Sequence, residues 1–189
     1  ILSRFRQTYP GVALDVRLTD EVVDLIGQGI DIAIRSGPLR SSELKSIRLY
    51  ETRRVIVASQ QYVAAFGIPD QPEDLTDHNW VMYSRVPETL RLAQGDQERK
   101  IPVSGSVQVD SATARLQFLR DGHGMAVVPF SDVADDIANG DLMRVLPDWS
   151  LPDLSVYAVY SGDVMRSSKV KTLLDFLRAQ LTDIDESRH

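Results

Sequence analysis

Segments with the period of a β-strand alternate with segments with the period of an α-helix along almost the whole chain. In the first part, the apolar spacing predicts a helix over 2–9, a strand over 12–18, a helix over 20–26 and a buried strand over 30–34. A chain that alternates in this way folds into an α/β structure, whose strands are commonly parallel because each helix crosses over the sheet. This alternation therefore predicts the α/β class and a parallel sheet.

The same alternation continues in the second part of the chain. Gly105 interrupts an otherwise regular strand pattern, and Gly122 ends the helix that precedes it. Asp110 or Ser111 is a good N-cap for that helix. We expect strands at 47–50, 54–58, 80–83, 100–109, 125–128 and 142–146, a strand followed by a turn at 90–97, and helices at 62–66, at 112–119 and between Ser131 and Gly140.

The last strand, expected at 154–160, and the last helix, expected at 170–181, have no obvious partner in the second part of the chain. The simplest arrangement returns both to the first part. We therefore predict one subdomain from residues 1–57 and 156–189 and a second from residues 58–155, joined by two crossing hinge strands. Between such lobes, at the carboxyl ends of strands, open α/β folds commonly bind small ligands.

The composition argues against several kinds of function. With 21 Lys and Arg against 27 Asp and Glu, the formal net charge is -6, so the chain lacks the excess of cations that binding to nucleic acid phosphates requires. It contains no cysteine, which excludes thiol catalysis, disulfides and thiolate metal sites. No apolar run reaches the roughly 18 residues of a membrane span. Because the chain opens with Ile1 inside an amphipathic stretch, we expect it to be a fragment of a longer protein.

Metal binding and catalysis have little support either. The three histidines, His78, His123 and His189, lie far apart and show no paired ligand spacing. The glycines at 122 and 124 stand after a helix and before a strand, which is the reverse of a dinucleotide-binding fingerprint. No base, nucleophile and orienting partner occur together. We expect no metal, no cofactor and no enzymatic activity, and we expect His78 to fix the turn that contains it.

Several short motifs occur in an order that resembles one known family. Residues 25–39 have the sequence LIGQGIDIAIRSGPL, residues 72–78 have PEDLTDH, and residues 122–129 have GHGMAVVP. Together with the YP pair that precedes Val12 and the segment 140–149, these motifs resemble the effector-binding domain of LysR-type transcriptional regulators. The resemblance covers nearly the whole chain, and the collinear set is more specific than any single motif.

This resemblance implies two Rossmann-like subdomains of the type 2 periplasmic-binding-protein kind, with a cleft for a small-molecule effector that can be anionic. It also implies a homodimer, tetramers in the full-length protein, a cytoplasmic location without a membrane, and contact with DNA only through an upstream winged helix-turn-helix domain that is absent here. Members of the family begin this domain with a strand that is missing from this chain. One wall of the pocket is therefore expected to be missing too.

A first group of candidate ligand-binding residues contains Arg35, Ser36 and Gly37, at the carboxyl end of the strand expected at 30–34. A guanidinium there could bind a carboxylate through two parallel hydrogen bonds. Ser36 and Gly37 add a hydroxyl and backbone N–H groups. The alternatives are a salt bridge from Arg35 to Asp31, a solvated arginine, and ordinary turn formation.

A second group begins with Ser111 and Thr113, where the helix expected at 112–119 starts. A hydroxyl and the free amides of a helix N-terminus favour negative charge on a ligand. Helix capping explains Ser111 equally well.

Two further pairs complete the candidates. Ser84 and Arg85 follow a strand end and could face the cleft from the second subdomain. Pro129 and Phe130 could supply an apolar wall, although packing at a strand end explains them as well.

Alternative functions of different classes stay open at this point. The first is a solute-binding protein of a transport system, which uses the same two-lobed architecture. The others are an enzyme on this scaffold and a domain that serves only for oligomerisation. An upstream helix-turn-helix would favour the regulator, and an upstream export signal would favour the transport protein.

Overall fold

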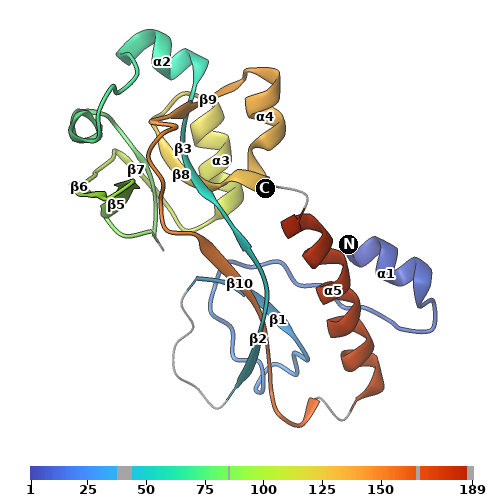
Figure 1. Ribbon diagram of the computed structural model, residues 1–189. Helices are drawn as coiled ribbons and strands as arrows, with labels where there is room; N and C mark the ends of the chain where they lie inside the picture. The colour runs from blue at the N-terminus through green and yellow to red at the C-terminus, as the bar shows by residue number, and fades with distance from the viewer. Residues whose placement is uncertain (38–43, 85, 165–166, 187–189) are drawn as a thin grey trace. The chain divides into compact units, whose positions relative to one another are not determined.

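Figure 1 shows the computed structural model of the chain, which describes residues 1–37, 44–84, 86–164 and 167–186. The chain forms two compact units. Unit 1 contains Ile1–Thr52 and Leu154–His189, and unit 2 contains Arg53–Asp153. Both boundaries lie earlier in the chain than those expected at 57/58 and 155/156. Two links therefore join the units, one at 52/53 and one at 153/154.

Unit 1 is built on a three-stranded sheet in the order β1 (Ala33–Ser36), β10 (Leu154–Tyr160), β2 (Lys45–Thr52). Helix α5 (Ser168–Glu186) lies along this sheet, as Figure 1 shows, and packs Val170, Leu174, Leu177 and Leu181 against it. Helix α1 (Leu2–Thr8) adds the buried ring of Phe5, whose centroid lies 5.4 Å from that of Phe176. In the structure, the last strand and the last helix thus pack with the first part of the chain.

Between α1 and β1 the sequence-based prediction was wrong. The described residues form neither a strand at 12–18 nor a helix at 20–26, and β1 begins only at Ala33. A strand needs a neighbouring strand to accept and donate its backbone hydrogen bonds, and residues 12–18 pair with none in the described parts of the chain. An amphipathic helix needs a surface to cover. The apolar side chains here have none, since Leu18 is 94% exposed and Ile26 67% exposed.

The expected parallel sheet is also wrong for unit 1. Strand β10 runs antiparallel to both of its neighbours, β1 and β2. It comes from the far end of the chain and inserts between β1 and β2, which follow each other in the sequence. Only β4 (Val81–Tyr83) and β7 (Val107–Val109) of unit 2 form a parallel pair of strands among the described residues.

Unit 2 is centred on β3 (Arg54–Ser59), which lies between β8 (Ala126–Pro129) and β9 (Leu142–Val145) and runs antiparallel to both. An isolated parallel bridge from Trp80 to Met125 joins β4 to the start of β8. A hairpin of β5 (Thr89–Gln94) and β6 (Gln97–Pro102) completes the strands. The helices are α2 (Gln60–Phe66), α3 (Ala112–Arg120), α4 (Ala134–Asn139) and two short 3-10 helices at Pro72–Asp77 and Phe130–Asp132. From residue 45 onward, most elements expected from the sequence are present within a few residues at their ends. The strand expected at 100–109 is an exception, because β6 ends at Pro102 and β7 (Val107–Val109) begins only after Gly105.

The interior of strand β3, from Val55 to Ala58, is buried on both faces, which explains why these four residues are all apolar. Ile56 and Ala58 pack into one apolar cluster with Trp80, whereas Val55 and Val57 pack into a second cluster with Leu119. Burial of a single large aliphatic side chain contributes about 1.5–3 kcal/mol. The two clusters on either side of β3 therefore hold the helices and the hairpin of unit 2 together.

The backbone at Asn79 and Trp80 lies against two glycines. A Cβ atom at Gly105 would overlap the carbonyl oxygen of Trp80, and one at Gly124 would lie 2.7 Å from the carbonyl oxygen of Asn79. Gly124 also has a φ of 156°, which disfavours other residues. The break expected at Gly105 is thus a place of close backbone contact, and it separates β6 from β7.

Gly105→Ala should destabilise unit 2 by about 3 kcal/mol or more, because the added methyl group must displace backbone rather than a flexible side chain. Urea unfolding followed by circular dichroism measures this loss. Gly95→Ala is the matched control in the same unit, because Gly95 has a positive φ but open space around its Cβ position. That variant should lose only about 1–2 kcal/mol, and an equal loss in both variants would contradict the role of the close contact.

Candidate functional site

Three segments of unit 2 end at the same edge of its sheet. Strands β4 and β7 are parallel, and the parallel Trp80–Met125 bridge aligns β8 with β4. Their carboxyl ends therefore lie on one side, where β4 leads into Ser84, β7 into Ser111 and β8 into Phe130. The Ser84 N–H donates a hydrogen bond of 2.9 Å to the Val109 carbonyl, which fixes the first two ends next to each other. The structure thus brings together candidates that lie up to 46 positions apart in the printed sequence.

Ser111 is the N-cap of α3. Its Oγ accepts a hydrogen bond of 3.4 Å from the Ala114 N–H, and its carbonyl accepts one of 3.0 Å from the Arg115 N–H. The capping role expected for Asp110 or Ser111 belongs to Ser111. Thr113 is exposed in the first turn of the helix. Capping and ligand binding are compatible at such a site, because the amides of the first turn are oriented toward the same space as the cap.

Pro129 and Phe130 lie at the end of β8, next to the start of β3. Pro129 pairs with Arg54, and the Phe130 N–H donates a 2.9 Å hydrogen bond to the Arg53 carbonyl. The Arg53 guanidinium lies 5.5 Å from the centre of the Phe130 ring, within the range of a cation–π contact. Both candidates are half-buried, so each presents part of its side chain at this edge.

Arg54 is a further basic residue at the start of β3. Its Nε donates a hydrogen bond of 2.7 Å to the Pro152 carbonyl. Burial removes water from the guanidinium and lowers its pKa from the usual value, while the carboxylate of Asp153 acts in the opposite direction. Since arginine stays charged even so, Arg54 adds a positive charge close to the end of β8.

Unit 1 carries the other candidates on and after β1. The Arg35 Nη2 donates a hydrogen bond of 2.7 Å to the Val23 carbonyl, and among the described residues it forms no ion pair with Asp31. The Gly37 N–H donates a 3.0 Å hydrogen bond to the Ser155 carbonyl, and its φ of 87° suits a glycine. Ser36 is exposed between them. Arg35, Ser36 and Gly37 thus form a second cluster, and their ligand-binding role stays a prediction, as it does for the residues of unit 2.

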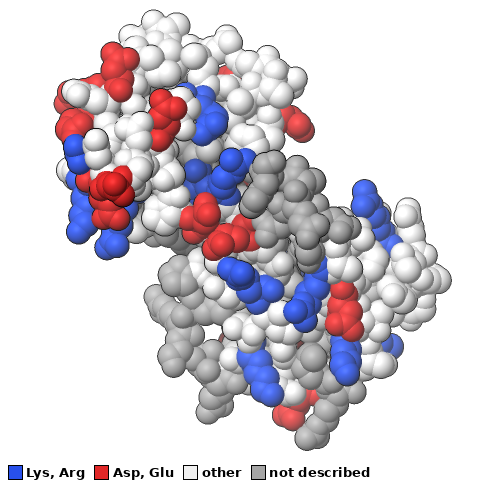
Figure 2. Space-filling view, viewed as in Figure 1, with Lys and Arg blue, Asp and Glu red and all other residues white. Residues whose placement is uncertain are grey.

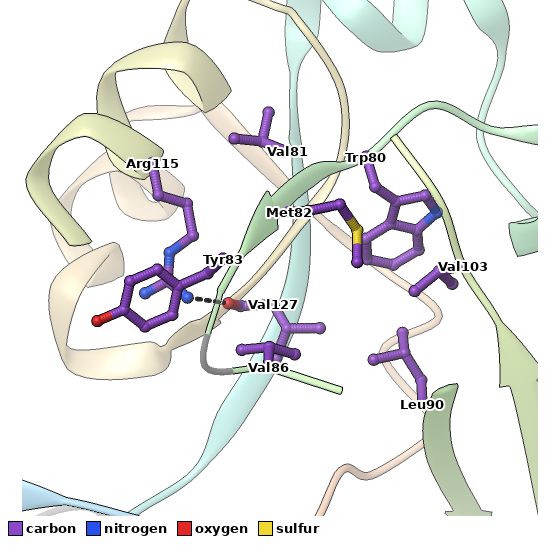
Figure 3. A pocket seen from close by; sticks show the side chains of 9 residues that line it. All are labelled: Trp80, Val81, Met82, Tyr83, Val86, Leu90, Val103, Arg115 and Val127. Atoms are coloured by element: carbon purple, nitrogen blue, oxygen red, sulfur yellow. Dashed lines mark hydrogen bonds between the residues drawn. The ribbon is translucent and has the colours of Figure 1, made fainter. Parts of the chain in front are cut away.

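A small pocket lies beside the edge in unit 2 (Figure 3). Its enclosed space is about the size of one water molecule, and Arg115 provides the only charged group in its lining. The lining residues are Trp80, Val81, Met82, Tyr83, Val86, Leu90, Val103, Arg115 and Val127.

Sequence analysis missed Arg115, Tyr83 and Arg53. Arg115 stands on the apolar stripe of α3, three residues after Ala112 and four before Leu119. A charge on an otherwise apolar stripe was the one available indication. The position of Arg53 depends on the pairing of β3 with β8, which no local pattern predicts. Arg85, a weaker candidate, lies outside the described residues.

Other surface features add little to the site. Acidic and basic side chains are interspersed on the face shown in Figure 2. Within the described ranges, no group of three or more acidic, histidine or cysteine residues could hold a metal ion. Among the helices of those ranges, none is both long and apolar enough to cross a membrane.

The chain has the type 2 periplasmic-binding-protein-like fold, in which two α/β units are joined by two links. The LysR substrate binding domain family matches residues 1–182. The chain belongs to this family. This confirms the resemblance inferred from the motifs.

Curated relatives agree with the family. The chain is 31% identical over 183 residues to the HTH-type transcriptional regulator PtxR of Pseudomonas aeruginosa, covering 96% of this chain and 59% of the relative. It is 31% identical over 187 residues to the HTH-type transcriptional activator AaeR of Escherichia coli K12, covering 97% of this chain and 60% of the relative. The chain therefore spans about three-fifths of the length of these relatives.

Solved structures share the fold. The regulatory domain of CrgA, a LysR-type regulator from Neisseria meningitidis, matches with a TM-score of 0.85 and 26% identity, covering 95% of this chain and 89% of that domain. The effector domain of AmpR from Pseudomonas aeruginosa matches with a TM-score of 0.78 and 19% identity, covering 99% of this chain and 90% of that domain. The second match supports the fold alone.

Ser111→Ala should lower the free energy of unfolding by about 1 kcal/mol, because α3 loses its side-chain cap. Ser111→Asp keeps an acceptor at the N-cap and should retain most of the stability. Urea unfolding of the three proteins measures the difference. Equal stability of the alanine variant and the wild type would show that the Ser111 cap contributes nothing.

Proposed function

We propose that the chain is the effector-binding and oligomerisation domain of a LysR-type transcriptional regulator, and that it binds a small metabolite. The observation that supports this most is the common edge of β4, β7 and β8, which gathers Ser84, Ser111 and Phe130. Hydroxyls, helix amides and an aromatic ring at one edge suit a small polar ligand better than a macromolecule. The nearby guanidinium groups favour an anion among such ligands.

The proposed mechanism uses the two links at 52/53 and 153/154. A metabolite bound by this domain would favour one of the two orientations of the units that these links allow. It can shift that equilibrium only by its difference in affinity for the two orientations. We propose that the shift is passed to a DNA-binding domain upstream in the full-length protein, and that the domain forms a homodimer there and the full-length protein a tetramer.

The rival functions are less well supported. The curated relatives PtxR and AaeR carry the names of transcriptional regulators, which does not favour a solute-binding protein of a transport system. For the same reason we propose that the chain is not an enzyme. Since a transcriptional regulator works where DNA is, we propose a cytoplasmic location.

A thermal-shift screen against small metabolites, with carboxylates well represented, tests effector binding. Ligand at 100 times its Kd should stabilise the domain by about 2.7 kcal/mol, which raises its melting temperature by several degrees. Arg35→Ala and Ser111→Ala should each weaken the best ligand about tenfold, because each removes about 1.4 kcal/mol of polar interaction. Isothermal titration calorimetry measures these affinities.

Arg91→Ala is the matched control for this experiment, because Arg91 is exposed on the β5–β6 hairpin. It should leave the affinity unchanged. A screen without any stabilising ligand would contradict effector binding by this domain. Unchanged affinity in both Arg35→Ala and Ser111→Ala would instead contradict the proposed site.

A further inference from the structure

Arg115 is the one charged side chain in the core of the described residues, with an exposed fraction of 5%. It occupies a place on the stripe of α3 where Leu116 and Leu119 are its neighbours. An ion moved from water into a protein interior loses several kcal/mol of solvation free energy, even after the surroundings relax. A cation near the start of a helix is also unfavourable with respect to the helix dipole. Packing alone would therefore favour an apolar residue at this position.

The contacts of Arg115 show what the charge does instead. Figure 3 shows the guanidinium beside the face of the Tyr83 ring, with a hydrogen bond to the main chain at Val127. The Cζ atom lies 4.5 Å from the centre of the ring, and Nη1 donates to the Val127 carbonyl at 2.9 Å. One side chain of α3 thus contacts both β4 and β8. The backbone N–H of Arg115 donates a hydrogen bond of 3.0 Å to the Ser111 carbonyl.

Each of these contacts lies close to a residue of the edge described above. Tyr83 immediately precedes Ser84, and Val127 lies shortly before Pro129 and Phe130. The carbonyl of Val127 belongs to a strand that also pairs with β3 through Ile56. The guanidinium is planar and presents several donors in a fixed fork, so it holds a ring and a carbonyl in a more fixed geometry than a lysine would, and a methionine has no donor at all.

We propose that Arg115 is a positioning residue of the effector site in unit 2. Through the Tyr83 ring and the Val127 carbonyl, it fixes the ends of β4 and β8 relative to the first turn of α3. It need not touch the effector to do so. This inference rests on the proposed function for its biological meaning, but the positioning itself can be measured without any effector.

Hydrogen exchange of single amides, followed by NMR on the intact chain, tests the proposal. The Ser84 and Phe130 N–H groups report the ends of β4 and β8, because they donate to the Val109 and Arg53 carbonyls at 2.9 Å each. The Ala93 N–H, which donates to the Ser150 carbonyl at 2.9 Å, is the reference in the hairpin of the same unit. In Arg115→Met, exchange at Ser84 and Phe130 should accelerate about tenfold more than at Ala93.

A merely structural role predicts a different result. If Arg115 only adds to the overall stability of unit 2, all three amides accelerate by the same factor through global unfolding. That uniform change would overturn the proposal, as would unchanged exchange at Ser84 and Phe130. Arg120→Met is the matched control on the same helix, because Arg120 forms an exposed ion pair with Asp136 at 2.8 Å. It should not produce the local acceleration at the two strand ends.

A pair of variants at Tyr83 keeps the proposal testable if Arg115→Met fails to fold. Tyr83→Phe preserves the ring face under the guanidinium and should exchange at Ser84 like the wild type. Tyr83→Leu removes the ring and should accelerate exchange at Ser84 several-fold relative to Ala93. Equal behaviour of the two variants would overturn the role of the ring contact. None of these outcomes bears on whether an effector exists, which the ligand screen decides separately.

Discussion

The contact of the Asn79–Trp80 backbone with Gly105 and Gly124 is the constraint on which the arrangement of unit 2 depends. The Asn79 side chain bonds to both the N–H and the hydroxyl of Ser106, at 2.9 and 3.0 Å, and to the carbonyl of His123. The Met125 N–H donates to the Asn79 carbonyl, and the Val81 N–H donates to the Met125 carbonyl. The Asn79–Trp80 segment thereby aligns the starts of β4, β7 and β8. Because the strands begin together, their carboxyl ends also come together.

Polar contacts of Tyr62 and His78 also hold this segment in place. They lie where the sequence indicates a turn. The Tyr62 hydroxyl accepts a hydrogen bond of 2.9 Å from the Asn79 N–H and lies 3.2 Å from Nδ1 of His78. Burial raises the pKa of Tyr62, whereas the bond from Asn79 lowers it. His78 therefore has a structural partner that accounts for its position without any catalytic role. These contacts connect the turn at His78 to the start of β4, and β4 leads on to the edge that carries Ser84.

The elements that could be predicted are those whose determinants lie within a few residues. Ser111 caps α3, Gly140 ends α4 with a positive φ, and the alternating residues of β5 point into the core. The predictions for residues 12–32 were wrong because a strand needs a neighbouring strand and an amphipathic helix needs a surface to cover, and the described residues offer neither there. The convergence of Ser84, Ser111 and Phe130 could be inferred from the family resemblance but not from any local pattern, since it depends on register. Arg115 was missed because a burial argument from periodicity assigns charges to the surface.

The position of β10 in the sheet of unit 1 has a consequence for the order of folding. Unit 2 is continuous in sequence, so it can fold as soon as its last residue has left the ribosome, without waiting for later segments. Unit 1 cannot, because the strand between β1 and β2 is separated from them by the whole of unit 2. Its closure requires a contact between distant parts of the chain, which is slow to form. Until Leu154–Tyr160 is synthesised, β1 and β2 lack the strand that joins them. We therefore expect the nascent chain to depend most on chaperones in that interval.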